Sequence, residues 1–323
     1  MSATACIRRH PSRLLGVLSL LAAACCVAFL TIGAAGQWDF VLVHRGARLA
    51  ALLLVAHAVA LSTVLFQTIT HNRILTPSVM GFDALYVLIQ AVLIFTLGAQ
   101  QLGGIDPRLK FVGEVVLMVG LSGLLFRWLF SGAAGSLHMT LLVGIVFGVL
   151  FRSLTSFVVR LIDPNEFMVL QDRMFASFNM VPAQLLSAAA LAVALVSVAV
   201  WRMRHALDTL ALGRELAINL GLDHQRLVRR VLVLVAVLVS VSTALVGPVT
   251  FFGLLVANLA YQLAGSHRHR VVLPAAGLLG AIFLVGGQVV LERVFSFGTA
   301  LSVVVEFLGG LMFIALLLRR GAR

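Results

Sequence analysis

Long apolar runs separated by short islands of charge constrain this chain more than any other feature. Hydrophobic residues make up 61% of its 323 residues, and charged residues only 11%. A water-soluble domain of this length needs more polar surface than that, whereas a run of about 20 apolar residues matches the hydrocarbon thickness of a bilayer. The sequence therefore predicts an all-α polytopic membrane protein. The spans share one apolar core, so residues 1–323 are expected to form a single integral membrane domain.

Ten of these runs are candidate transmembrane helices. They are Leu14–Ile32, Leu49–Ile69, Val79–Leu97, Phe111–Phe130, Met139–Leu161, Ala183–Trp201, Val231–Val246, Thr250–Ala264, Val271–Leu291 and Ala300–Leu318. The eighth run, Thr250–Ala264, is the shortest, so nine spans are the alternative to ten.

The distribution of positive charge distinguishes these two topologies. With an inside N-terminus, ten spans place 16 of the 24 Arg and Lys residues inside and 8 outside, whereas nine spans place 12 on each side. Cytoplasmic loops carry an excess of Arg and Lys, so we expect ten spans with both termini in the cytoplasm. The net charge of +12 then reflects membrane orientation, and no nucleic-acid partner is expected.

Two stretches of the chain share a pattern. The run Leu49–Ile69 is followed by a break from Pro77 to Gly81, and the run Val231–Val246 by a break from Gly247 to Gly253. The two runs cross the membrane in opposite directions. The pattern predicts an inverted internal repeat of about spans 2–5 and 7–10, which is typical of transporters. Within the fifth span, Gly144 and Gly148 predict close helix packing.

The inside segment 202–230 is long for a connector. It is expected to form two short helices separated at Gly213 and ended at Gly221, with Asp223 capping the next helix. A loop this small cannot bury its own leucines, so a partner or the membrane surface must cover them; they are Leu207, Leu210, Leu216 and Leu220. The alternative is an amphipathic interfacial helix that leads to Arg229 and Arg230.

Three charged residues stand out from this pattern. Arg45 and Arg48 fall outside, against the general trend, where they either snorkel from a helix end or meet the acidic residues of a docking protein. Glu306 lies within the tenth span, where a carboxylate is a functional candidate unless it sits at a water-filled mouth. The sequence predicts no metal site or cofactor, and His267 and His269 are expected in a solvated inside loop.

Four segments resemble the FecCD-type permeases, which form the membrane channel of ATP-driven importers for iron–siderophore complexes, haem and cobalamin. They are Arg45–Arg48, Phe66–Gly81, Ala211–Asp223, and Gly247–Leu254 with His269–Pro274 behind it. Within the second segment, Asn72-Arg73-Ile74-Leu75-Thr76-Pro77 resembles the branch that serves catecholate-type siderophores, where two different permeases usually pair.

This resemblance implies a permease of the cell inner membrane that moves ferric siderophore. It implies a soluble binding protein, periplasmic or lipid-anchored, that docks at Arg45, Arg48 and Arg293. It also implies that the loop 202–230 sits in a cleft of the ATPase, through residues that include Leu210, Gly213, Glu215, Ala217 and Gly221. A second permease subunit completes the channel, either a different chain or a second copy.

The chain lacks a phosphate-binding loop ending in Gly-Lys-Ser/Thr, so ATP hydrolysis is expected on a separate subunit. The alternative function is an ion-coupled secondary transporter without an ATPase. That function requires buried ionisable pairs near mid-membrane, and the sequence offers Glu306 as one candidate acid. A membrane enzyme is a weaker third interpretation, because no metal or nucleophile motif is present.

Overall fold

The computed structural model describes residues 11–32, 38–130, 137–178, 181–293 and 301–321, and all regular structure within them is helical. The elements are α2 (Pro11–Thr31), α3 (Trp38–Thr70), η1 (Pro77–Met80), α4 (Phe82–Gly104), α5 (Pro107–Phe130), α6 (Leu137–Val159), α7 (Pro164–Met174), α8 (Ala183–Leu210), α9 (Arg214–Asn219), α10 (His224–Val246), α11 (Phe252–Ala264), α12 (His269–Arg293) and α13 (Leu301–Gly321).

Each of the ten predicted runs coincides with one helix, which confirms the all-α class. Within the described residues, seven helices are long and apolar enough to cross a membrane: α2, α3, α4, α6, α8, α10 and α12. Two shorter apolar helices follow, α11 and the part Leu301–Leu311 of α13. The chain is therefore a polytopic membrane protein.

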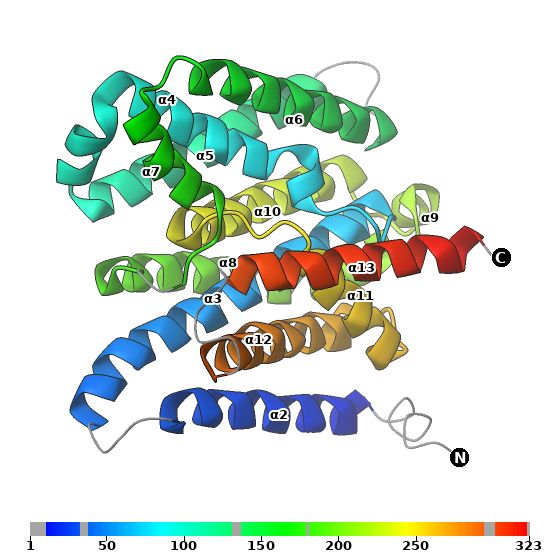
Figure 1. Ribbon diagram of the computed structural model, residues 1–323. Helices are drawn as coiled ribbons and strands as arrows, with labels where there is room; N and C mark the ends of the chain where they lie inside the picture. The colour runs from blue at the N-terminus through cyan, green and yellow to red at the C-terminus, as the bar shows by residue number, and fades with distance from the viewer. Residues whose placement is uncertain (1–10, 33–37, 131–136, 179–180, 294–300, 322–323) are drawn as a thin grey trace.

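Three helices form the centre of the bundle (Figure 1). In their most apolar windows, 67% of α3, 67% of α10 and 61% of α12 is buried, against 11% of α6. α3 packs on both α10 and α12, while α2 covers α12 and α5 covers α10. The outward face of α6 is apolar and exposed, as expected for a helix that meets lipid or another subunit.

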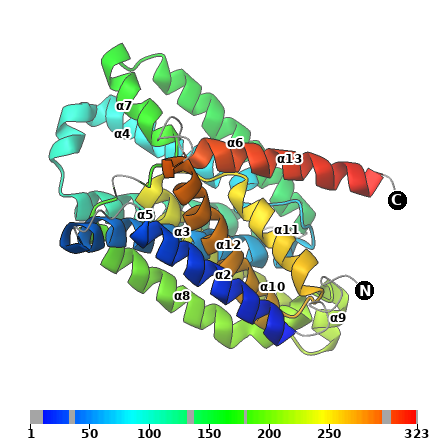
Figure 2. The same ribbon diagram turned by 60° about the horizontal axis from the view of Figure 1, so that its bottom comes forward.

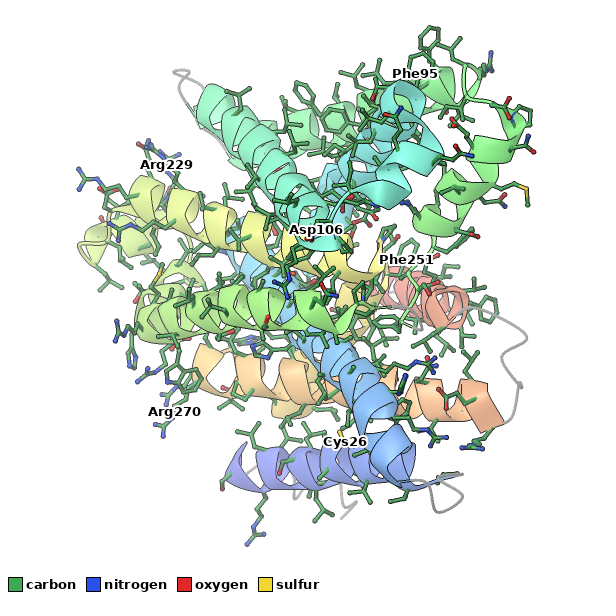
Figure 3. The ribbon with its side chains drawn as sticks, turned by 90° about the vertical axis from the view of Figure 1, so that its left-hand side faces the viewer. Cys26, Phe95, Asp106, Arg229, Phe251 and Arg270 are labelled. Atoms are coloured by element: carbon green, nitrogen blue, oxygen red, sulfur yellow. The ribbon has the colours of Figure 1, made fainter. Side chains whose placement is uncertain are left out.

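The two ends of the bundle differ in what they carry. In Figure 1, α9 lies on the right with the start of α2 and the end of α13, whereas α7 lies on the left. Figure 2, turned by 60°, shows the same grouping. The side chains of Arg229 and Arg270 project together from one side of the molecule (Figure 3). After the roles that the sequence leads us to expect, we call the end with α9 the coupling end and the opposite one the outer end.

Both predicted breaks are present, and each depends on glycine. η1 ends at Gly81 with φ 92°, and α10 ends at Gly247 with φ 98°, a left-handed region that glycine adopts without steric cost. A Cβ on Gly81 would lie 2.5 Å from the Cα of Gly148. The close packing predicted for the fifth span is therefore confirmed, with the broken segment rather than a second helix as its partner.

The third span extends past its predicted end at Leu97. Gly98 (φ 76°) kinks α4, and the helix then continues to Gly104. The backbone N–H of Ala99, freed by the kink, donates to Glu166 Oε1 of α7 at 3.2 Å. This contact ties α7 to the outer end of α4.

Candidate coupling, docking and pore sites

The coupling end is built on a continuous helix rather than on the two short helices that the sequence suggested. α8 runs unbroken from Ala183 to Leu210, and only α9 is a separate short helix. Leu207 and Leu210 are fully buried in the main core. The expectation that a partner must cover them was wrong, because the end of α8 packs on the protein itself.

Two glycines set the bounds of α9. Gly213 (φ 108°) precedes the helix and Gly221 (φ 83°) follows it. The N–H of Leu222 donates to the carbonyl of Ala217 at 3.0 Å, and the N–H of Gly221 to that of Ile218 at 2.9 Å. These two bonds form a Schellman motif, so the predicted role of Gly221 as the C′ residue is confirmed. Asp223 caps α10 through the N–H of Arg226, as predicted.

The exposed apolar side chains of the coupling end lie on and beside α9. They are Leu212 (57% exposed), Leu216 (53%), Ile218 (49%) and Leu220 (65%). Ala217 is fully buried and holds the helix against the body, and Glu215 lies in its first turn. We call the four exposed residues the α9 patch. A cluster of exposed apolar side chains on a short helix is typical of a surface that another protein or the membrane covers.

Two of the three arginines predicted for docking, Arg45 and Arg293, bind the outer end of α2. Arg45 Nη1 donates to the carbonyls of Phe29 at 3.2 Å and Ile32 at 2.8 Å. Arg293 also donates to Ile32, and Arg48 Nη1 lies 4.0 Å from Glu292 Oε1. The last carbonyls of a helix lack intrahelical partners, and a cation there is favourable. Arg45 and Arg293 therefore have a structural role within the chain.

Glu306 lies beside the second broken segment. Thr250 Oγ1 donates to Glu306 Oε1 at 3.4 Å. One turn further along α13, a Cβ on Gly309 would lie 2.6 Å from that of Phe251. The acid and the glycine thus bring α13 directly onto the break, much as Gly148 brings α6 onto Gly81.

Sequence reasoning overlooked Asp83, which begins α4 directly after the first break. Its carboxylate is within electrostatic reach of Glu306 and Arg152, and its Oδ2 is buried without a hydrogen-bond partner among the described residues. Asp83 also lines a cavity of about 20 Å³, together with hydroxyls of Ser78 and Thr250. A polar cavity of this size has room for one water molecule. An acid within an apolar run was the signal that could have identified it.

A second overlooked acid, Glu114, belongs to a buried polar chain near the outer end. Gln90 Nε2 donates to Glu114 Oε1 at 2.7 Å, and Arg173 Nη1 donates to Gln90 Oε1 at 2.5 Å. Lys110 Nζ lies 4.0 Å from the same Glu114 oxygen. These residues link α4, α5 and α7 beside an outer cavity of about 450 Å³.

His269 also departs from expectation. It was expected in a solvated loop, but only 2% of it is exposed, because its ring fits between α8 and α3 with partners on both sides. Among the described residues, no group of three or more His, Cys, Asp or Glu side chains could hold a metal ion.

Comparisons with known proteins agree with this arrangement. The petrobactin import system permease protein YclO of Bacillus subtilis is 47% identical over 91% of this chain and 93% of its own length. The permease FatC of the petrobactin import system of Bacillus anthracis is 38% identical over 86% of this chain and 79% of its own. A solved inward-facing structure of the metal-chelate type of ABC transporter shares the fold with a TM-score of 0.83, at 23% identity and covering 95% of this chain and 99% of that one. Residues 12–319 match the FecCD transport family, to which this chain therefore belongs.

Proposed function

We propose that this chain is the membrane permease of an ATP-driven importer that carries a ferric siderophore of the petrobactin kind into the cell. The observation that carries the proposal is the 47% identity to a petrobactin permease along 91% of the chain. A second petrobactin permease at 38% identity supports the same ligand. The permease itself is a channel subunit and not an enzyme.

The proposed topology is ten spans, with both termini and the loop 202–230 in the cytoplasm and the chain in the inner membrane. The pairing of helices supports an inverted repeat. α3 packs on α12 as α10 packs on α5, and α4 packs on α6 as α11 packs on α13. An axis that exchanges spans 2–5 with spans 7–10 relates these pairs. Gly148 and Gly309 carry no side chain, so α6 and α13 approach the two breaks closely and in equivalent ways.

The ATPase is proposed to bind the α9 patch. Its four exposed apolar side chains fit a cleft in a partner, and Gly213 and Gly221 define α9 as a separate short helix. Leu210 and Ala217 support it from below, since both are fully buried. The interfacial-helix alternative is weaker, because α9 has only 6 residues and the strength of interfacial binding scales with the apolar area that is buried.

Two further partners are proposed. A binding protein docks at the outer end, where Arg48 is the most available of the three arginines because Arg45 and Arg293 are bound to α2. A second permease subunit, either a different chain or another copy, covers α6 and α13. Both helices expose large apolar side chains, such as Val149 on α6 and Phe307 on α13.

Glu306 and Asp83 are proposed to face the pore between these two helices. Together with Arg152 they supply charge beside both breaks, where the substrate of an inverted-repeat transporter is expected to pass. The same pair is the one observation that favours the alternative, an ion-coupled secondary transporter, because buried acids near a helix break are typical of ion pathways.

Uptake of petrobactin loaded with radioactive iron, and of cobalamin labelled with radioactive cobalt, in a strain that lacks this chain tests the ligand. We expect restored uptake of ferric petrobactin on complementation, and little uptake of cobalamin. Glu306→Gln and Asp83→Asn should alter the rate without making uptake depend on the proton gradient. Uptake of cobalamin alone would contradict the ligand, and loss of uptake on collapse of the proton gradient at constant ATP would favour the secondary transporter.

A further inference from the structure

Asp208, near the end of α8, is hydrogen-bonded to the first residue of α12. Its Oδ1 accepts from both the backbone N–H and the ring Nδ1 of His269, each at 2.7 Å. The opposite ring nitrogen, Nε2, lies 2.8 Å from Thr68 Oγ1 near the end of α3. His269 and Thr68 are 2% and 5% exposed. A chain of hydrogen bonds, buried at His269 and Thr68 and partly exposed at Asp208, thus joins the end of α8, which leads into α9, to two central helices.

The chemistry of this chain is structural. The first N–H groups of a helix have no intrahelical partner, and Asp208 supplies one to α12 from a different helix, with its charge favourably placed at the N-terminus. The order acid, histidine, hydroxyl resembles a hydrolytic triad. However, Thr68 Oγ1 also lies 2.8 Å from the carbonyl of Val64 and is buried. No substrate could reach it, so these residues position helices.

The end of α3 is in turn fixed to the segment that leads into the first break. The carbonyl of Arg73 accepts from Gln67 Nε2 at 2.7 Å and from Asn258 Nδ2 at 3.0 Å. The Arg73 guanidinium lies 4.6 Å from the ring centre of Tyr261, with Nη2 2.9 Å from His267 Nδ1. Residues 71–76 therefore move with the ends of α3 and α11.

We propose that Asp208, His269 and Thr68 form a latch that transmits displacement of α9 to the first broken segment. α8 is one continuous helix that carries Asp208 near its end. A displacement of α9 therefore moves Asp208 directly. Through Thr68 this displacement reaches residues 71–76 and then η1, which contacts α6 at Gly148. The proposal rests on the proposed function, because it takes the ATPase as the source of the push.

Hydrogen–deuterium exchange of the permease–ATPase complex, purified with its own ATPase, tests the latch with ATP as the only added ligand. In the wild type, ATP should change exchange both in α9 and in residues 71–81. Thr68→Val removes one hydroxyl at nearly constant shape. His269→Asn keeps an amide near the position of Nδ1 and His269→Gln one near that of Nε2, so each breaks a different link. His205→Gln, on the exposed face of the same α8 stem, is the matched control.

We expect the ATP response of residues 71–81 to become about tenfold smaller in the three latch variants, the scale of one strong hydrogen bond. The response of α9 and of the His205→Gln control should be unchanged. A full response at residues 71–81 in all three variants overturns the latch. Loss of the complex in all three, with His205→Gln intact, overturns it too, because the contacts would then serve assembly alone. A wild-type chain that binds no ATPase contradicts the proposed function first, and the latch with it.

Discussion

The coupling end and the outer end of this chain present their notable side chains in opposite ways. At the coupling end, the α9 patch exposes four large apolar residues to solvent. At the outer end, Arg45 and Arg293 already bind the end of α2, and Arg48 faces Glu292. An exposed apolar group lacks a partner within the chain and indicates one outside it. A charged group at a surface often has an internal partner, so it is weaker evidence for docking.

The largest expected effect comes from the glycines that bound α9. Gly213→Val and Gly221→Val place a β-branched residue at φ 108° and 83°, which costs about 1–3 kcal/mol each and redirects the helix. Co-purification of the ATPase should be lost, while membrane insertion is retained. Gly120→Ala is the control, since that glycine is helical and a Cβ there meets nothing within 4 Å. Normal ATPase binding in both valine variants would contradict the claim that the coupling end is the surface that binds the ATPase.

A pair of leucines separates partner binding from stability. Leu216→Glu should abolish ATPase association and change thermal stability by less than about 0.5 kcal/mol, because the side chain is 53% exposed. Leu210→Ala should lower stability by about 2–5 kcal/mol, because that side chain is fully buried. Thermal unfolding in detergent and a pull-down of the ATPase measure the two effects. If Leu216→Glu binds the ATPase as well as Leu210→Ala does, the α9 patch is not an interface.

Arg45 should behave as a structural residue. Arg45→Gln removes donors to the end of α2 and should lower stability by about 1 kcal/mol. Thermal unfolding at low and high salt measures the loss. Unchanged stability together with lost binding-protein association would reverse the interpretation and return Arg45 to the docking surface.

Arg48 should show the smallest effect and the one most specific to docking. Arg48→Glu breaks a partly exposed pair with Glu292, worth at most about 1 kcal/mol. Its main effect should be a slower, less salt-dependent association with the binding protein, since charges are screened beyond about 8 Å at physiological ionic strength. Association rates measured across a salt series test this. Identical salt dependence in wild type and variant would leave the arginines as helix-end residues only.

The parts of this molecule that follow local rules were predictable from sequence. The ten apolar runs, the Gly221 C′ position and the Asp223 cap depend on neighbouring residues alone, and they occur as expected. The burial of Leu210 was not predictable, because it depends on α8 continuing past its predicted end at Trp201 and packing on distant parts of the chain. The partners of Arg45 lie 13 and 16 residues away, on another helix.

The two acids beside the breaks show the same limit. Glu306 was recognised because a carboxylate interrupts an apolar run, and the same signal was present at Asp83. That the two lie near each other depends on the approach of α4 and α13, whose acids are more than 200 positions apart along the chain. The residue pattern within one helix does not predict which residues of another helix lie close to it.

Transport by purified components in sealed vesicles tests the central claim most directly. The permease, its ATPase and the second permease subunit are reconstituted with the binding protein outside, and uptake of ferric petrobactin is followed with and without ATP inside. The account predicts uptake that requires internal ATP, is unaffected by proton or sodium gradients, and is lost in Leu216→Glu. Uptake driven by an ion gradient in the absence of ATP and of the ATPase would contradict it.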